Sequence, residues 1–285
     1  MRSDRKTSGP RGWQGRSPES WGAELGVPLL ELHDELPSTS DRLRELAQRG
    51  TPAFTVVVAG TQSQGRGRMG REWHSPPGSG LWMSVLVRDV PERFSGILPL
   101  AVGVAVARAL ERMTADSVAL KWPNDILIGD RKVAGILCET VGEPGEGVIV
   151  GIGVNLRTPE GGLPPELAPG VAFLEGVSGL PVAEPAVARL LLGELGRWVR
   201  PVPERLEGRL LAEWEARDCL RGRLVILDGG ASGTARGLRA DGALVVTLAD
   251  GREVDVRAGG VRLAGVGRSP ALHGAIAPRY GTGGE

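Results

Sequence analysis

Apolar and polar residues follow two different periods along the chain, and the period changes from one segment to the next. Short runs rich in Val, Ile and Leu, each followed by turn residues, predict buried strands. These runs cover residues 54–59, 81–87, 118–122, 126–128, 133–139 and 148–154. Longer apolar stretches predict a short helix that follows Ser38-Thr39-Ser40-Asp41 and ends at Gly50, and further helices over 95–113, 184–199 and 203–218. This order of elements predicts an α+β domain over residues 37–220.

The pattern changes after residue 220. Between Arg223 and Leu263, five short strands alternate with Asp-Gly turns, which is typical of a small all-β barrel of about 45 residues. We therefore expect a second domain over residues 221–265. The remaining segments, 1–36 and 266–285, are rich in Gly, Pro, Arg and Ser, and this composition predicts flexible tails.

Composition narrows the class of protein. The chain has 285 residues, and 34 Lys and Arg balance 34 Asp and Glu, so it is not a general polyanion binder. Its longest apolar stretch, 97–107, is shorter than the roughly 20 residues of a membrane span, and its N-terminus lacks the apolar core of a signal peptide. Two distant cysteines, Cys138 and Cys219, form no disulfide framework. We expect a soluble, cytoplasmic protein that binds neither membranes nor nucleic acid.

Lysine is rare in this chain. Only Lys6, Lys121 and Lys132 are lysines, and the other 31 basic residues are arginines. Lysine is a compact, mobile cation, whereas arginine is a rigid fork. The two lysines in the middle of the chain are therefore candidates for a specific chemical role.

The segment Gly65-Arg-Gly-Arg-Met-Gly70 formally matches the G-x-G-x-x-G pattern of dinucleotide-binding proteins. That pattern requires a helix to begin at the glycines, but the residues that follow, Arg71-Glu-Trp-His-Ser-Pro-Pro-Gly78, cannot form one. A Rossmann site is therefore excluded. A glycine loop with three arginines can still bind an anion through its amides and guanidinium groups, and the alternative is a solvated hairpin tip.

Three further motifs end or begin predicted strands: Lys121-Trp-Pro-Asn-Asp125, Lys132-Val-Ala-Gly-Ile136 and Gly151-Ile-Gly-Val-Asn155. Each of them alone is equally consistent with ordinary turn chemistry. Their combination and order are more specific. Together with Ser38-Thr39-Ser40, Gln62, the arginine–glycine segment and Trp73, they closely resemble the catalytic domain of biotin–protein ligases, over roughly residues 37–265.

The resemblance implies a fold and a reaction. The fold is a mixed β-sheet with flanking helices, similar to class II aminoacyl-tRNA synthetases, followed by an SH3-like C-terminal domain. The enzyme would use ATP to convert biotin to biotinyl-5′-AMP and then transfer biotin to one lysine of a biotin carboxyl carrier protein or domain of acetyl-CoA carboxylase or a related carboxylase. Because a carboxylate and an α-phosphate repel each other, the site needs positive charge in a pocket with little water.

The resemblance also assigns roles to residues. The implied catalytic residues are Arg68, Lys121 and Lys132. Contacts to biotin are implied for Ser38, Thr39, Ser40, Gln62, Arg66, Gly67, Arg68 and Lys121. Contacts to ATP are implied for Arg68, Trp73, Asn124, Asp125, Lys132 and Asn155. Mg²⁺ would arrive with the ATP phosphates, and Asp125 is its candidate protein ligand.

One position departs from the family pattern. The first motif usually reads Ser-Thr-Asn, but the third residue here is Ser40, which reaches less far and is also a candidate cap for the following helix. Some members of the family carry an N-terminal winged helix of about 60 residues and act as repressors, whereas only 37 residues precede Ser38. We therefore expect a ligase without repressor function. The alternatives are a lipoate–protein ligase of the same fold and a nucleic-acid-binding module that uses the arginines.

Overall fold

The computed structural model describes residues 13, 15–90, 96–142 and 146–264. Its centre is a seven-stranded sheet with the strand order β1-β2-β3-β7-β6-β5-β4. The strands are β1 (Leu30–Leu36), β2 (Val56–Gln62), β3 (Gly80–Val87), β4 (Val118–Lys121), β5 (Asp125–Ile128), β6 (Arg131–Thr140) and β7 (Val148–Asn155). Only β1 and β2 run parallel, and every other neighbouring pair is antiparallel. The expected mixed sheet is confirmed.

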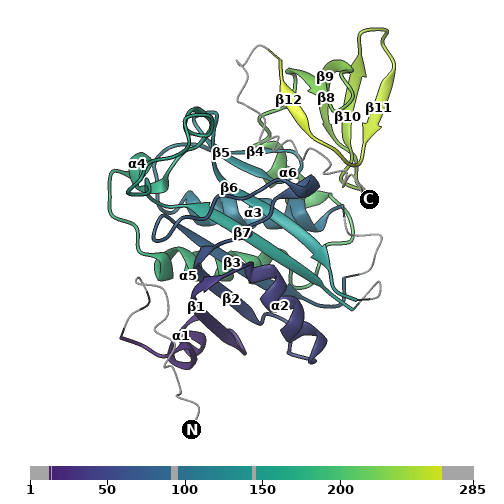
Figure 1. The fold of residues 1–285 in the computed structure, drawn as a ribbon. Coiled ribbons are helices and arrows are strands. Elements are labelled where there is room, and N and C mark those ends of the chain that lie inside the picture. Colours follow the sequence, from purple (N-terminus) through teal and green to yellow (C-terminus); the bar gives the residue numbers. More distant parts are fainter. Residues whose placement is uncertain (1–12, 14, 91–95, 143–145, 265–285) are drawn as a thin grey trace, which may run out of the picture.

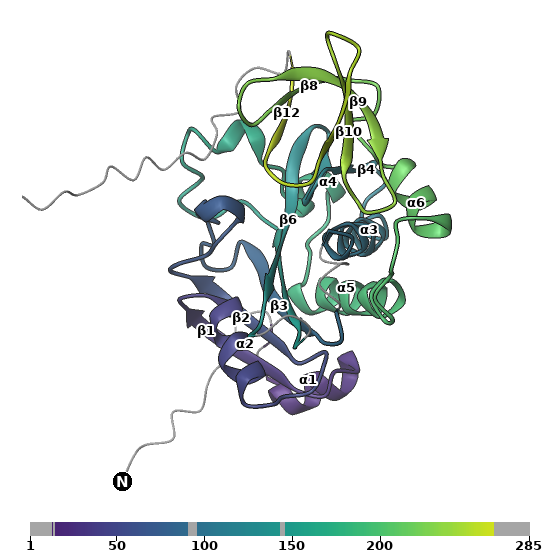
Figure 2. The same ribbon diagram turned by 90° about the vertical axis from the view of Figure 1, so that its right-hand side faces the viewer.

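Helices cover the two faces of this sheet unequally. They are α1 (Pro18–Leu25), α2 (Thr39–Gln48), α3 (Leu98–Leu110), α4 (Leu174–Ser178), α5 (Glu184–Trp198) and α6 (Gly208–Glu215). The nearly all-apolar α3 packs beside α5 along one face, where the larger core lies (Figure 2). On the opposite face, α2 covers β2, β3 and the first half of β7 through a smaller core that includes Leu43, Val57 and Ile149. The rest of that face, over β6 and the second half of β7, is not covered by α2 and borders a cavity.

The N-terminal segment is more ordered than its composition predicts. The expectation of a flexible tail through residue 36 is wrong for residues 18–36, which form α1 and β1. The Ser17 side chain caps α1, and Leu30 and Leu32 are buried while β1 pairs with β2. Trp13 is also buried. In β1, the charged residues between the leucines obscure the apolar–polar alternation that is expected of a strand with one buried face. Residues 1–12 and 266–285, where tails were also expected, lie outside the described residues.

A second sheet follows α6. It contains β8 (Leu224–Leu227), β9 (Ser232–Leu238), β10 (Leu244–Leu248), β11 (Glu253–Val256) and β12 (Val261–Leu263), all antiparallel, in the order β11-β10-β9-β8-β12. Its five strands agree with the expected SH3-like architecture. This sheet lies beyond the β4–β5 end of the large sheet (Figure 1). Hydrogen bonds join the two parts, among them one of 3.0 Å from the Trp122 indole to the Gly242 carbonyl.

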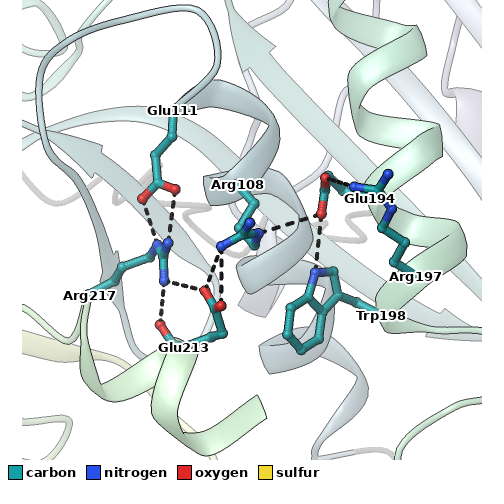
Figure 3. Close-up of polar contacts among 7 residues, drawn as sticks. All are labelled: Arg108, Glu111, Glu194, Arg197, Trp198, Glu213 and Arg217. Carbon is teal, nitrogen blue, oxygen red and sulfur yellow. Dashed lines mark hydrogen bonds and ion pairs between the residues drawn. The ribbon is translucent and has the colours of Figure 1, made fainter. Parts of the chain in front are cut away.

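An ion-pair network joins α6 and the residues after it to α3 (Figure 3). Arg217 donates to both oxygens of Glu111 at 2.7 and 2.9 Å and to Glu213 at 2.7 Å, and Glu213 in turn accepts from Arg108. The Arg217 carbonyl then accepts from the Leu120 amide on β4 at 2.7 Å. The network thus fixes the outer edge of the strand that ends in Lys121.

Candidate active site

A cavity of about 980 Å³ opens on the α2 side of the large sheet. Strand alternation points Gly151 and Gly153 of β7 toward this side, and Gly135 of β6 lies opposite Gly153. Because these glycines have no side chains, they form a floor for the cavity where larger residues would fill the space. The walls come from the N-terminus of α2, the segment 66–73, the β4–β5 turn, the loop 166–171 and the second sheet.

Neutral hydroxyl and amide groups lie at one end of the cavity. Thr39 donates its amide and its hydroxyl to Oε1 of Gln62, at 2.8 and 3.1 Å. Its hydroxyl also lies 2.8 Å from the hydroxyl of Ser84, which in turn lies 3.1 Å from that of Ser40. The result is a connected group of donors and acceptors without net charge. Its members Thr39, Ser40 and Gln62 line the cavity, and so does the neighbouring Ser38.

Two details of this end differ from the sequence interpretation. Ser40 lies inside the first turn of α2, whose N-cap position is Ser38, so Ser40 does not cap the helix. Its hydroxyl instead joins the buried chain to Ser84. Sequence reasoning missed Ser84, although a hydroxyl within the otherwise apolar strand Gly80–Val87 was a usable signal.

The arginine–glycine segment forms a compact hairpin, which we call the 65–73 hairpin. The Trp73 amide donates to the Gly65 carbonyl at 2.9 Å, and the Gly67 amide donates to the Arg71 carbonyl at 2.7 Å. A Cβ atom on Gly65 would lie 2.4 Å from the Trp73 carbonyl oxygen, so only glycine fits there. The exclusion of a dinucleotide helix is confirmed, because the segment holds only the short 3₁₀ turn Arg68–Gly70.

Cations gather around one carboxylate at the other end of the cavity. Lys121 ends β4 and lies directly opposite Asp125, which begins β5. Asp125 forms an ion pair with Lys132, whose Nζ lies 2.6 Å from Oδ1, and Nζ of Lys121 lies 4.0 Å from Oδ2. Burial opposes ionisation of Asp125, but the charges of Lys132 and Lys121 outweigh it and lower the pKa of the carboxyl. Burial also lowers the pKa of the half-buried Arg68 guanidinium.

Trp73 adds a flat aromatic surface to the cavity. The Trp73 indole lies against the floor glycines, since a Cβ on Gly153 would be 2.6 Å and one on Gly135 would be 2.8 Å from its ring atoms. Nζ of Lys132 lies 4.9 Å from the ring centroid, within range of a cation–π interaction. The indole nitrogen is buried without a hydrogen-bond partner.

Two asparagines have mainly supporting contacts. The Asn124 side chain lines the cavity and donates to the Ile136 carbonyl at 2.8 Å, which ties the β4–β5 turn to β6. Asn155 is buried and does not line the cavity, and its side-chain amide donates to the Lys132 carbonyl at 3.1 Å. The structure therefore gives Asn155 a supporting contact under Lys132, and its expected contact with adenine stays a prediction.

The second sheet supplies a wall that sequence reasoning did not find. Asp228, Gly259, Gly260 and Arg262 line the cavity, and Nη1 of Arg68 donates to the Gly259 carbonyl at 3.4 Å. The sequence feature that could have indicated this wall is the pair of turns Asp228-Gly-Gly230 and Ala258-Gly-Gly260, because glycines allow the backbone to approach another part of the chain closely. The cavity is thus built by both sheets.

The structure brings together every predicted site residue except Asn155. Within the described parts of the chain, no three His, Cys, Asp or Glu side chains form a metal-binding group. No described helix is long and apolar enough to cross a membrane. The carboxylate Asp125 by itself fits a cation that is held mainly by the phosphates of a nucleotide.

Fold and site together define an α+β domain whose cavity has a neutral polar end and a cationic end. Residues 33–155 match the biotin/lipoate A/B protein ligase family. The biotin–[acetyl-CoA-carboxylase] ligase of Paracoccus denitrificans is 34% identical over 226 residues, which are 76% of this chain and 93% of that protein. The corresponding ligase of Mycobacterium tuberculosis is 34% identical over 84% of this chain and 91% of that protein. The chain belongs to the biotin–protein ligase family.

Solved structures agree with this assignment. The biotin protein ligase from Aquifex aeolicus in complex with biotin and ATP superposes with a TM-score of 0.72 and 30% identity, covering 83% of this chain and 99% of that one. The bifunctional ligase/repressor BirA of Bacillus subtilis is 39% identical over 171 residues, 59% of this chain. The chain spans about half, 52%, of the length of that relative.

Proposed function

We propose that the protein is an ATP-dependent biotin–protein ligase that forms biotinyl-5′-AMP and transfers biotin to a lysine. One observation carries the proposal: a single cavity has neutral hydroxyl and amide groups at one end and the cations of Lys121, Lys132 and Arg68 at the other. The names of the relatives in Paracoccus denitrificans and Mycobacterium tuberculosis, and the biotin and ATP in the Aquifex aeolicus complex, support the same substrates.

Biotin fits the neutral end by its chemistry. Its ureido head is uncharged and needs both donors and acceptors, which Ser38, Thr39 and Gln62 supply, with Ser40 behind them and the backbone at Arg66 and Gly67 beside them. The valeryl chain would then run past Gly151 and along the Trp73 indole, which covers Gly135 and Gly153. That course brings its carboxylate to Lys121.

ATP fits the cationic end. Arg68 and Lys132 would hold the phosphates, and Trp73 with Asn124 would border the nucleotide on the side of β6. Mg²⁺ would enter with the phosphates and neutralise their charge, and Asp125 is the carboxylate within reach. The supporting contact of Asn155 would keep Lys132 in place.

The reaction consists of two substitutions. In the first, a biotin carboxylate oxygen attacks the α-phosphorus and the bond to the β-phosphate oxygen breaks, which releases pyrophosphate. Lys121 would offset the repulsion between the two anions. In the second, the neutral amine of the acceptor lysine attacks the acyl carbon, AMP leaves, and the amine proton passes to solvent or to a base on the acceptor side.

The acceptor would be a biotin carboxyl carrier protein or domain, and the names of the Paracoccus and Mycobacterium relatives favour that of acetyl-CoA carboxylase. The cytoplasmic location expected from the sequence stays a prediction.

Biotin-dependent exchange of pyrophosphate into ATP tests the proposal. Exchange with biotin, and none with lipoate in a parallel reaction, is the expected result. Exchange with lipoate alone would assign the same chemistry to the other substrate of the family. Absence of exchange with both would refute the proposed function.

A further inference from the structure

The hairpin that carries Arg68 and Trp73 has one ion-paired side chain, and that side chain is not Arg68. Arg66 donates to both oxygens of Asp41, from Nη1 to Oδ2 at 2.6 Å and from Nη2 to Oδ1 at 2.7 Å. Arg68 donates to a backbone carbonyl, and the Arg71 side chain lies 4.0 Å from the Met69 sulfur. Among the described residues, Arg66 is thus the electrostatic anchor of the 65–73 hairpin.

Two more charges extend the pair into a compact group, which we call the Asp41 clamp: Asp41, Arg44, Arg66 and Glu139. Arg44 donates to Oδ1 of Asp41 at 2.9 Å. Oε1 of Glu139 lies 3.5 Å from both Arg44 and Arg66. Two positive and two negative charges therefore lie together without a net charge. The clamp joins helix α2, the hairpin and strand β6, three elements that border the cavity.

The geometry of the pair favours a positioning role. A bidentate arginine–carboxylate contact fixes the direction of the guanidinium group as well as its distance. Hydrogen bonds from Arg66 lower the pKa of Asp41, so the carboxylate is ionised at neutral pH. Arg66 is also the residue whose backbone forms a bridge with Glu72 across the hairpin, so fixing its side chain fixes the base of the hairpin.

The position of Asp41 in the sequence adds a second consequence. It directly follows Ser38, Thr39 and Ser40, which form the neutral end of the cavity. The same turn of α2 thus borders the proposed biotin head group and holds the hairpin that carries Arg68. Order at one end of the cavity is thereby linked to order at the other.

We propose that Asp41 is a positioning residue, which through Arg66 holds the 65–73 hairpin over the cavity and couples it to the N-terminus of α2. The kinetic part of this inference rests on the proposed function, whereas the structural part does not.

Limited trypsin digestion without ligands tests the structural part, because the hairpin contains three arginines that trypsin can cut. Cleavage after Arg66, Arg68 and Arg71, mapped by mass spectrometry, should be about five-fold faster in Asp41→Asn than in the wild type. Asp41→Glu keeps the carboxylate and should stay within about two-fold. Glu45→Gln breaks the neighbouring pair with Arg42 on the same helix and should match the wild type. Equal cleavage of Asp41→Asn and wild type would overturn the proposal.

Hydrogen exchange of the wild type tests the clamp without a substitution. Raising NaCl from about 0.05 M to about 1 M screens exposed ion pairs. Amide exchange in a peptide covering 65–73 should then accelerate, while exchange in a peptide from β3, which has no charged side chain, should not. Unchanged exchange in the hairpin contradicts the clamp, and this readout decides the matter even if Asp41→Asn fails to fold.

Pyrophosphate exchange tests the coupling. Asp41→Asn should raise the KM for biotin about five-fold, and Asp41→Glu should restore it. An unchanged KM for biotin in Asp41→Asn would contradict the proposed coupling between the hairpin and the N-terminus of α2. If the wild type shows no exchange, the proposed function fails, and the ligand-free digestion and hydrogen exchange still decide whether Asp41 holds the hairpin.

Discussion

Nζ of Lys132 lies 2.6 Å from Oδ1 of Asp125, and the same carboxylate has Nζ of Lys121 at 4.0 Å. Both lysines of the described chain therefore share one counter-ion at the cationic end of the cavity. The carboxylate keeps two like charges close together before an anionic substrate arrives. In the proposed reaction, an ATP phosphate would compete with Asp125 for the ammonium group of Lys132.

This relationship predicts the effect of Asp125→Asn. Loss of the carboxylate leaves the two ammonium groups to repel each other and removes the candidate Mg²⁺ ligand, so kcat of pyrophosphate exchange should fall at least about ten-fold. The affinity for biotin, measured by calorimetry, should change by less than about three-fold, since the proposed site of the head group is the other end of the cavity. Asp116→Asn, on an exposed turn, is the control. Full exchange activity in Asp125→Asn would exclude a role for the carboxylate.

Substitution of Lys121 should separate chemistry from binding. Lys121→Ala removes the charge that would meet the biotin carboxylate, so we expect adenylation to slow by about 100-fold or more. ATP affinity should change by less than about five-fold, because Lys132 and Arg68 remain. Calorimetry and single-turnover formation of biotinyl-AMP measure the two effects. Lys6→Ala, the remaining lysine of the chain and outside the described residues, serves as control. Lost ATP affinity with normal adenylation would reverse the assignment.

Arg68→Gly should release the reaction intermediate. A charged hydrogen bond to phosphate is worth about 1.5–3 kcal/mol, so biotinyl-AMP should dissociate roughly 10–100-fold faster. The free acyl adenylate would then label lysines at random on bystander proteins, which streptavidin blots detect. Arg68→Lys, which keeps the charge but not the fork, should lie between the two. Clean labelling of a single acceptor lysine by Arg68→Gly would contradict the prediction.

Gly153→Ala should displace Trp73. The added Cβ would lie 2.6 Å from the indole, too close for the ring to stay on the sheet. We expect a loss of stability of about 1–3 kcal/mol and a higher KM for ATP, together with a shift of tryptophan fluorescence. Gly161→Ala is a matched control, because nothing lies within 4 Å of its Cβ. Unchanged fluorescence in Gly153→Ala would show that the indole does not rest on the strand.

The N-terminal strand should contribute stability that depends on pH. A hydrogen bond from His33, helped by the two-pronged contact with Arg42, lowers the pKa of Glu31 to about 2. The unfolded value is 4.5, so the folded state favours the carboxylate, and this stabilisation is complete above about pH 4.5 and is lost as the pH falls toward about 2.

Glu31→Gln should therefore cost about 1–2 kcal/mol at pH 7, and the difference from wild type should shrink as the pH approaches 2. Urea denaturation at several pH values measures it, with Glu35→Gln on the same strand as control. A difference that stays constant from pH 7 to pH 2.5 or grows in acid would be incompatible with the ion pair.

The sequence predicts this fold well where local patterns decide it. Apolar runs between turn residues locate β2 to β7, and the Asp-Gly turns locate the second sheet. The pattern fails at β1, where three charged residues and a histidine between leucines resemble a tail until pairing with β2 buries one face. Burial supplied by a distant partner is not visible in local composition.

The site shows the same division. The motifs predict most of the residues that line the cavity, because each motif lies at a strand end or in a turn. Ser84 and Asp228 were not predicted, since their importance arises only from contacts across the fold. Asn155 donates to the Lys132 carbonyl, a contact that residue type alone does not reveal, and its expected contact with ATP stays a prediction.

The hydrogen bond from Arg68 to Gly259 joins residues 191 positions apart in the chain. Because the second sheet forms part of the cavity wall, neither half of the polypeptide carries a whole pocket. A protein cut between α6 and β8 would therefore lack part of the cavity wall in each fragment. The small sheet is therefore part of the pocket and not an appendage to it.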